Sequence, residues 1–181
     1  VYCRLLGQQG DWVIRAGKLD RWVLAGPDDQ LLKLKEYLPQ MKTLGHYELQ
    51  LRARPKQKAR TATLVVRIGQ VKIPQPKHAS PWVKQLGQEP ISMNVIEVME
   101  RNPPPGVEPI RWVLLTSLPV ERWEQVWEAI GFYEQRWLIE EYHKALKTGC
   151  NCQSHQLKTK GRLEALVGLT SVVAIRLLQL K

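Results

Sequence analysis

The chain of 181 residues holds 27 Lys and Arg against 17 Asp and Glu, and the resulting formal net charge of +10 attracts polyanions such as nucleic acids, although it also serves solubility. The sequence has no apolar run long enough to span a bilayer and no signal-peptide pattern at Val1, so we expect a cytoplasmic protein that does not enter a membrane. The cysteines, Cys3, Cys150 and Cys152, form an odd set without the spacing of secreted frameworks, which argues against disulfides.

The first part of the sequence predicts a strand, a connection and a short helix. Residues 11–15 form a short apolar strand, and a segment rich in Gly, Pro and Asp follows it through Asp29. A short helix that ends near Pro39 is then indicated by the apolar residues Leu31, Leu32, Leu34 and Leu38.

The middle of the sequence alternates between apolar and polar residues. Strands are predicted over residues 45–54, 60–69, 71–73 and 91–99, and turn residues separate them. This spacing is typical of an antiparallel sheet, and the proline run at residues 103–106 marks the end of this β-rich stretch.

A basic ribbon is predicted between the strands at residues 45–54 and 60–69. Its cations recur at every second position: Arg52, Arg54, Lys56, Lys58 and Arg60. In an extended hairpin such a set projects to one side, where it would lie along a DNA backbone without reading bases. Pro55 interrupts the ladder, so the alternative is a solvated loop.

The last part of the sequence predicts a buried strand followed by helices. Residues 110–116 are nearly all apolar, as in a strand covered on both faces. A helix is expected to begin at residues 118–121, and Trp123 and Trp127 have the i, i+4 spacing of core packing. The final helix, residues 161–181, is apolar along much of its length and should pack on the core.

Four residues with the spacing Y-x2-R-x3-E-x6-K are the most informative feature of the chain. On a regular α-helix, Tyr133, Arg136, Glu140 and Lys147 fall within an arc of about 60°. One carboxylate between two cations suits chemistry on a phosphodiester, because the cations keep it ionised and attract phosphate. The alternative is an ordinary i, i+4 ion pair on a solvated helix.

The segment around these four residues is similar to a known family. Residues 130–149 read IGFYEQRWLIEEYHKALKTG, which closely resembles the signature of bacterial cut-and-paste transposases of the insertion-sequence-four group, including the Tn-five type. The likeness extends through residues 111–120, RWVLLTSLPV, and residues 171–180, SVVAIRLLQL.

The resemblance implies a fold and a division of the chain. It implies an α/β protein with the C-terminal part of a ribonuclease-H-like core, a β-rich insertion and a C-terminal helical segment. Residues 1–19 and 106–159 would belong to the core, and the second of these segments would bear the glutamate. Residues 20–105 would form the insertion, and residues 160–181 would lead towards a dimerisation region.

The resemblance also implies roles for individual residues. Glu140 matches the glutamate of a DDE site and would ligate Mg²⁺ or Mn²⁺, while Tyr133, Arg136 and Lys147 would hold phosphates of the transposon end. Trp112 and Trp137 match aromatic residues at a pocket for a flipped base, and Arg15 matches a basic position facing DNA. For Trp112, packing in the core is the alternative.

The two aspartates of a DDE site have no match in this sequence. The family's second aspartate opens a motif resembling D-R-E-A-D, followed by a helix and a strand that ends in arginine. Residues 1–6 and 11–15 resemble that helix and strand, so this aspartate is expected before Val1, and none of Asp11, Asp20, Asp28 and Asp29 has the matching context. We therefore expect a transposase fragment that binds transposon-end DNA, is inert alone and forms a homodimer in the complete synaptic complex. The alternative is a non-catalytic module that binds DNA or another transposase and acts as an inhibitor.

Overall fold

The computed structural model describes residues 10–53, 58–76, 78–85, 89–151, 154 and 157–180, apart from the side chain of Trp82. It consists of two compact units, Val1–Ile130 and Gly131–Lys181, each of which is described by itself. The helix expected at residues 1–6 lies outside the described residues.

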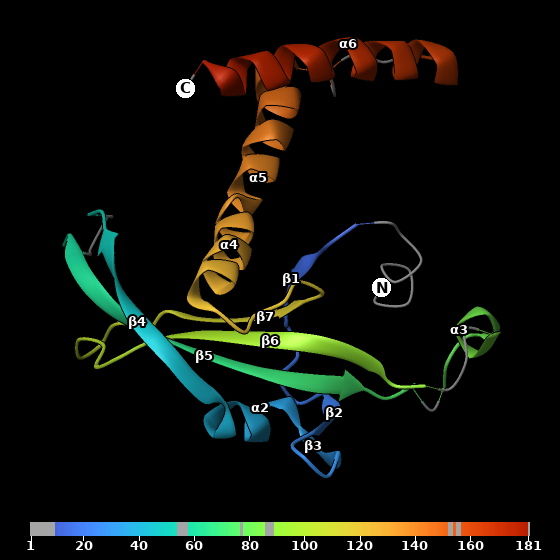
Figure 1. The fold of residues 1–181 in the computed structure, drawn as a ribbon. Coiled ribbons are helices and arrows are strands. Elements are labelled where there is room, and N and C mark those ends of the chain that lie inside the picture. Colours follow the sequence, from blue (N-terminus) through green and yellow to red (C-terminus); the bar gives the residue numbers. More distant parts are fainter. Residues whose placement is uncertain are drawn as a thin grey trace. The chain divides into compact units, whose positions relative to one another are not determined.

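The first unit is built on an antiparallel sheet (Figure 1). The strands are β1 (Val13–Arg15), β2 (Trp22–Ala25), β3 (Gln30–Lys33), β4 (Lys42–Leu51), β5 (Arg60–Ile73), β6 (Ile91–Glu100) and β7 (Arg111–Thr116). Their order is β1-β7-β6-β5-β2-β3, and β4 also pairs with β5. Each of these pairings is antiparallel, as the alternating sequence predicted.

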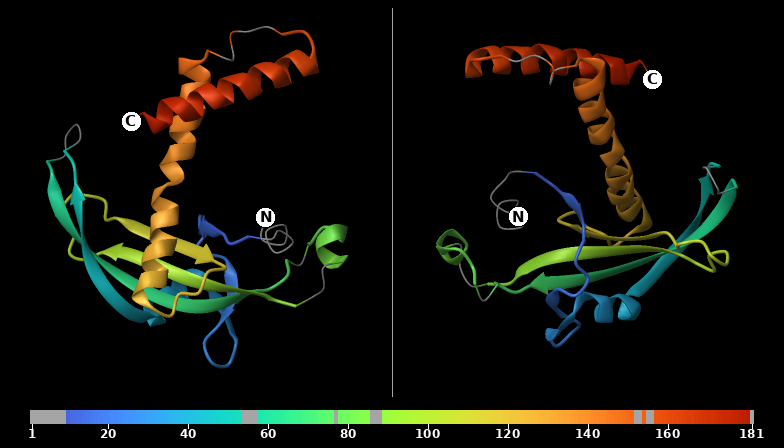
Figure 2. Two further views of the ribbon diagram at one scale, coloured as in Figure 1. Left: turned by 45° about the horizontal axis from the view of Figure 1, so that its top comes forward. Right: turned by 180° about the vertical axis from the view of Figure 1, so that it is seen from behind.

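The long strand β5 joins two segments that the sequence predicted as separate strands. It pairs with β6 without interruption, from Leu64 opposite Glu100 to Ile73 opposite Ile91, and Figure 2 shows its curvature from two further directions. Gly69 does not end the strand. It lies where β5 packs against Tyr37 and Met41. A Cβ atom there would come within 2.8 Å of the Tyr37 hydroxyl and 2.9 Å of Met41. Glycine at this position permits a close approach rather than a turn.

A hairpin replaces most of the connection that was predicted before Asp29. Strands β2 and β3 pair from Trp22 opposite Lys33 to Ala25 opposite Gln30. The turn uses left-handed backbone at Gly26, with φ of 80°, and at Asp29, with φ of 49°. The predicted helix therefore begins later than expected: α2 is Leu34–Tyr37, and the 3-10 helix η1 (Leu38–Gln40) contains Pro39.

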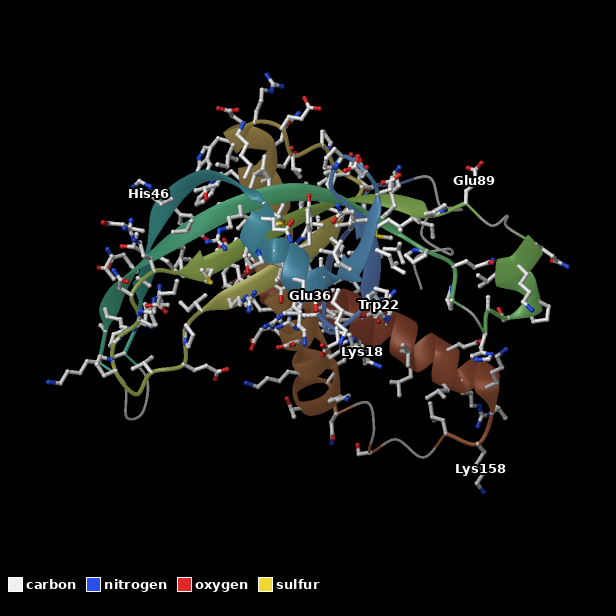
Figure 3. The ribbon with its side chains drawn as sticks, turned by 90° about the horizontal axis from the view of Figure 1, so that it is seen from below. Lys18, Trp22, Glu36, His46, Glu89 and Lys158 are labelled. Carbon is white, nitrogen blue, oxygen red and sulfur yellow. The ribbon has the colours of Figure 1, made fainter. Side chains whose placement is uncertain are left out.

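One face of the sheet carries the main hydrophobic core. Strands β5, β6 and β7 contribute alternate residues to it, among them Val71, Val95 and Leu115, and Leu34 and Leu38 cover them from α2 and η1. Figure 3, seen from below, labels Glu36 on α2 and Trp22 on β2, and Trp22 is about half exposed. The aliphatic residues of these strands thus form a buried layer between the sheet and its short helices.

The opposite face contacts α4 (Trp123–Glu134). Tyr47 on β4 meets Trp127 edge to face, with ring centroids 4.9 Å apart, and Trp123 stacks on Trp127 at 6.2 Å. The helix begins at Trp123 instead of residues 118–121, because the side-chain oxygen of Gln125 accepts the backbone N–H groups of Glu121 and Arg122 at 3.1 Å each. The predicted packing role of the two tryptophans is met in part, since Trp127 is 46% exposed.

The second unit consists of helices. It contains α5 (Arg136–Lys144), the π-helical turn η2 (Ala145–Gly149) and α6 (Lys160–Gln179). The Tyr142 hydroxyl donates to the Ser171 hydroxyl at 2.8 Å, and this hydrogen bond joins α5 to α6. The predicted packing of the final helix on the core stays a prediction. Within the part of the chain that the structure describes, no helix has the length and apolar content needed to cross a bilayer.

The fold is therefore mixed α/β, with a curled antiparallel sheet and several helices. A further short helix, α3 (Pro81–Gln85), lies in the connection between β5 and β6 and was not predicted. Strand β7 pairs with β1 on one side and with β6 on the other. The described sheet thus runs without a break from the segment expected as core into the segment expected as insertion.

Candidate nucleic-acid interface

The four residues of the Y-x2-R-x3-E-x6-K set lie on successive helical segments rather than on one regular α-helix. Tyr133 is in the last turn of α4, Arg136 and Glu140 are on α5, and Lys147 is in η2. In η2 the backbone N–H of Cys150 donates to the carbonyl of Ala145 at 2.8 Å, which is an i to i+5 bond. The prediction of a single regular helix is wrong at the junction before Arg136 and at η2. A π-helical turn holds more residues than an α-turn, so Lys147 does not keep the direction that regular offsets give.

Arg136 and Glu140 form an ion pair on the surface of α5. The guanidinium Nη1 donates to the Glu140 carboxylate, and the two side chains are 54% and 65% exposed. The bond and charge of Glu140 raise the pKa of Arg136 above its ordinary value, and Tyr133 adds a smaller effect in the same direction. An exposed i, i+4 pair contributes little to stability, so both side chains can exchange this contact for a ligand.

Lys147 and Trp137 extend this surface within the second unit. The side chain of Lys147 is exposed and makes no hydrogen bond or ion pair with any described residue, while its neighbour Leu146 is buried. Trp137 is 51% exposed, directly after Arg136. The helical set therefore offers a phenol, a carboxylate, two cations and an indole on accessible helix surface.

Trp112 and Arg15 lie on the same face of the sheet. Arg15 pairs with Leu114 across β1 and β7, and Leu114 and Trp112 are two positions apart on β7. The Arg15 guanidinium donates to the carbonyl of Arg111 at 3.4 Å, and Trp112 is half buried opposite Val98. Both residues belong to the first unit and Trp137 to the second, so the pocket for a flipped base stays a prediction.

The predicted basic ribbon follows the hairpin of β4 and β5. Arg52 and Lys58 are exposed and make no ion pair with a described residue, whereas Arg54 and Lys56 lie outside the described residues. Arg60 differs, because its guanidinium donates through both terminal nitrogens to the Glu100 carboxylate, with 3.1 Å from Nη2 to Oε2. Among the described residues of the ribbon, Arg52 and Lys58 are therefore the cations whose charge no acidic side chain neutralises.

Two buried carboxylates on β6 were not singled out in the sequence. The Glu97 side chain is fully buried and accepts from Arg111 at 2.7 and 2.9 Å and from Arg67 at 3.3 Å. Glu100 accepts from Arg60 and from the backbone N–H of Ile110 at 3.1 Å. The available signal was the presence of two acids in the largely apolar stretch at residues 95–100, since buried acids require partners.

The described side chains do not form a metal site. No group of three or more His, Cys, Asp or Glu residues with ligand geometry occurs among residues 10–53, 58–76, 78–85, 89–151, 154 and 157–180. Glu140 has Arg136 as its partner, and a lone carboxylate beside a cation does not fit Mg²⁺, which demands octahedral oxygen ligands. No protein-family model matches the chain.

Proposed function

We propose that this chain is part of a DDE transposase of the insertion-sequence-four group and that it binds the DNA of transposon ends. The observation that supports this most is the accessible grouping of Tyr133, Arg136 and Glu140 on α4 and α5. The phenol and the guanidinium can donate hydrogen bonds to phosphate oxygens, and an arginine can bind two of these oxygens in bidentate geometry. In this proposal the phosphate takes over the hydrogen bond that Arg136 now donates to Glu140.

The proposed fold is a ribonuclease-H-like core with a β-rich insertion at residues 20–105. The pairing of β1 with β7 supports it, because residues 13–15 and 114–116 meet across this long intervening segment. Trp112 and Arg15 share a sheet face on these two strands. In the proposal both residues would contact DNA on this face, and Trp137 would make its own contact with DNA within the second unit.

Catalysis would require carboxylates that this chain does not supply. In the proposed family, Glu140 joins two aspartates around divalent metal ions, and none of the four aspartates here matches their context. The described residues do not fit a metal, so the chain by itself should bind DNA without cutting it.

The first experiment measures binding of the chain to duplex DNA by fluorescence anisotropy at several salt concentrations. We expect weak binding that falls steeply as salt rises, because contacts to several phosphates release counterions. Charge reversal in the Arg52→Glu, Lys58→Glu double variant should weaken binding to all sequences about equally. Lys84→Glu on α3, an exposed cation away from the ribbon, is the matched control for each of the two reversals made singly. An affinity that stays flat across the salt series would contradict the proposal.

The second experiment separates a transposase part from a non-catalytic module. In a complete transposase that contains this segment, Glu140→Ala should abolish Mg²⁺-dependent cleavage of a labelled transposon end and leave end binding nearly intact. Lys147→Ala should weaken end binding, whereas Lys144→Ala serves as its control from the preceding turn. Cleavage that survives Glu140→Ala would favour the alternative module, whose role is binding alone.

A further inference from the structure

A recess lies at the end of the sheet where β5 begins and β6 ends. It has a volume of about 450 Å³, it is open to solvent, and its lining includes Arg60, Thr61, Thr63, Arg101 and Asn102. The backbone N–H of Arg101 donates to the carbonyl of Thr63 at 2.8 Å, which joins the two sides of the lining. All these residues belong to the first unit, so the recess is defined within it.

The charge of the recess comes from one arginine. Arg60 and Glu100 neutralise each other, and the Glu100 side chain is only 2% exposed. Arg101 is exposed, and its side chain makes no hydrogen bond or ion pair with the described part of the protein. A ligand in the recess therefore meets a net positive charge beside an ion pair whose charges cancel.

The remaining polar groups of the recess suit an oxyanion. Thr63 supplies a hydroxyl and Asn102 a carboxamide, whereas the hydroxyl of Thr61 already donates to Gln50 at 2.9 Å and is not counted as a donor to the anion. Asn102 has left-handed backbone with φ of 53°, which turns the chain directly after Arg101. Hydroxyls, amides and an arginine are the groups that proteins use to contact phosphate oxygens.

We propose that this recess binds one backbone phosphate of a nucleic acid, with Arg101 as its principal contact. The proposal rests on the proposed DNA binding and assigns it a subsite beyond the ribbon. Leu51 pairs with Arg60, so Arg52 follows directly at the same end of the sheet. A strand that contacts Arg52 and Lys58 would thus continue to the recess, where Arg101 holds the next phosphate by charge-assisted hydrogen bonds.

The test compares Arg101→Ala with Arg122→Ala, since Arg122 is also exposed and without an ion pair but follows the other end of β7. Anisotropy with duplex DNA over a salt series should show an affinity loss of about three- to tenfold for Arg101→Ala, with the salt slope reduced by about one. Arg122→Ala should leave both unchanged, and Arg101→Lys should restore the slope. In NMR spectra of the wild type, DNA should shift the backbone amides of Thr61, Thr63 and Asn102, and inorganic phosphate alone should shift them only at much higher concentration.

The possible failures point to different conclusions. No binding of DNA by the wild-type chain would overturn the proposed function and the subsite together. Binding that Arg101→Ala and Arg122→Ala reduce equally, or that neither reduces, would overturn the subsite and leave DNA binding in place. Phosphate and DNA shifting the recess amides at equal concentrations would assign the recess to a free anion instead of a nucleic-acid backbone.

Discussion

Two acids of β6, Glu97 and Glu100, are buried and paired with arginines. Glu97 is held between Arg67 and Arg111 from the two neighbouring strands, and Glu100 is held by Arg60. Both carboxylates are buried, so the arginines supply the hydrogen bonds that water would otherwise provide. The resulting ion pairs connect β5, β6 and β7 towards the end of the sheet that carries the recess.

Replacing Glu97 should destabilise the protein far more than breaking an exposed ion pair. Glu97→Gln keeps the size of the side chain but removes its charge-assisted bonds, and we expect the free energy of unfolding to fall by about 1–3 kcal/mol. Asp20→Asn breaks the pair of Asp20 with Lys35, whose side chains are 72% and 48% exposed, and should change stability little. Urea denaturation at neutral pH measures both. Equal losses would show that burial does not strengthen the Glu97 contacts.

Glu100 should make the stability of the first unit depend on pH. The hydrogen bond from Arg60 holds the pKa of Glu100 below its ordinary value of 4.5, although burial opposes this effect. The stabilisation is therefore fully present above about pH 4.5 and is lost as the pH falls through the lower folded-state value. Urea midpoints measured from neutral to acidic pH should fall less in Glu100→Gln than in the wild type. Parallel curves for the two proteins would contradict this linkage.

At the scale of elements, the contact of β4 with α4 depends on a glycine. Strand β4 has an irregular register between Thr43 and Gly45, and the ring of Trp123 lies against Gly45. The bulge turns the strand where the helix approaches, and the missing side chain leaves room for the indole. The same stack continues through Trp127 to Tyr47.

Adding a methyl group at Gly45 should displace this stack. A Cβ atom there would lie 2.9 Å from Cζ3 of Trp123, which is closer than carbon atoms pack. We expect Gly45→Ala to cost about 1–3 kcal/mol, as overpacking does elsewhere. Gly17→Ala is the control, because a Cβ atom at Gly17 meets nothing within 4 Å. Thermal unfolding and tryptophan fluorescence measure the effect. Unchanged tryptophan emission in Gly45→Ala would show that the added methyl group does not displace Trp123.

At the scale of the whole molecule, the two units differ in how much they bury. In the described part of the second unit, Leu146, Thr170 and Ala174 are buried, whereas α6 exposes large apolar side chains such as Leu169 at 71% and Val172 at 62%. The first unit holds the continuous core beneath its sheet. A segment with few buried contacts opens at lower free energy than a packed sheet.

Hydrogen exchange should therefore separate the two units. We expect the amides of α5 and α6 to exchange faster than those in the centre of β5 and β6. The sheet unit supplies its own control, because the short helix α3 lies outside the core cluster and should also exchange early. Protection of α6 equal to that of β6 in the isolated chain would show that this helix is stabilised by more than its described contacts.

Several elements of the fold followed from local sequence pattern. The alternation in residues 60–69, 71–73 and 91–99 predicted strands, which the structure shows as β5 and β6, because side chains two positions apart share one face and must match the core. The apolar run before Thr116 predicted a buried strand for the same reason. The spacing of Arg136 and Glu140 likewise predicted their shared helix surface.

Partners distant in sequence were decided only by the tertiary structure. The sequence by itself determined that Glu97, Glu100 and Arg101 are charged, but not that the first two meet arginines of neighbouring strands while the third lines a recess. It also left Gly69 as a break between strands, although the contact with Tyr37 and Met41 explains it within one strand. Local periodicity determines which face of a strand or helix a side chain occupies. Ion pairs and close contacts between elements depend instead on strand order and register, because these bring together residues that are far apart along the chain.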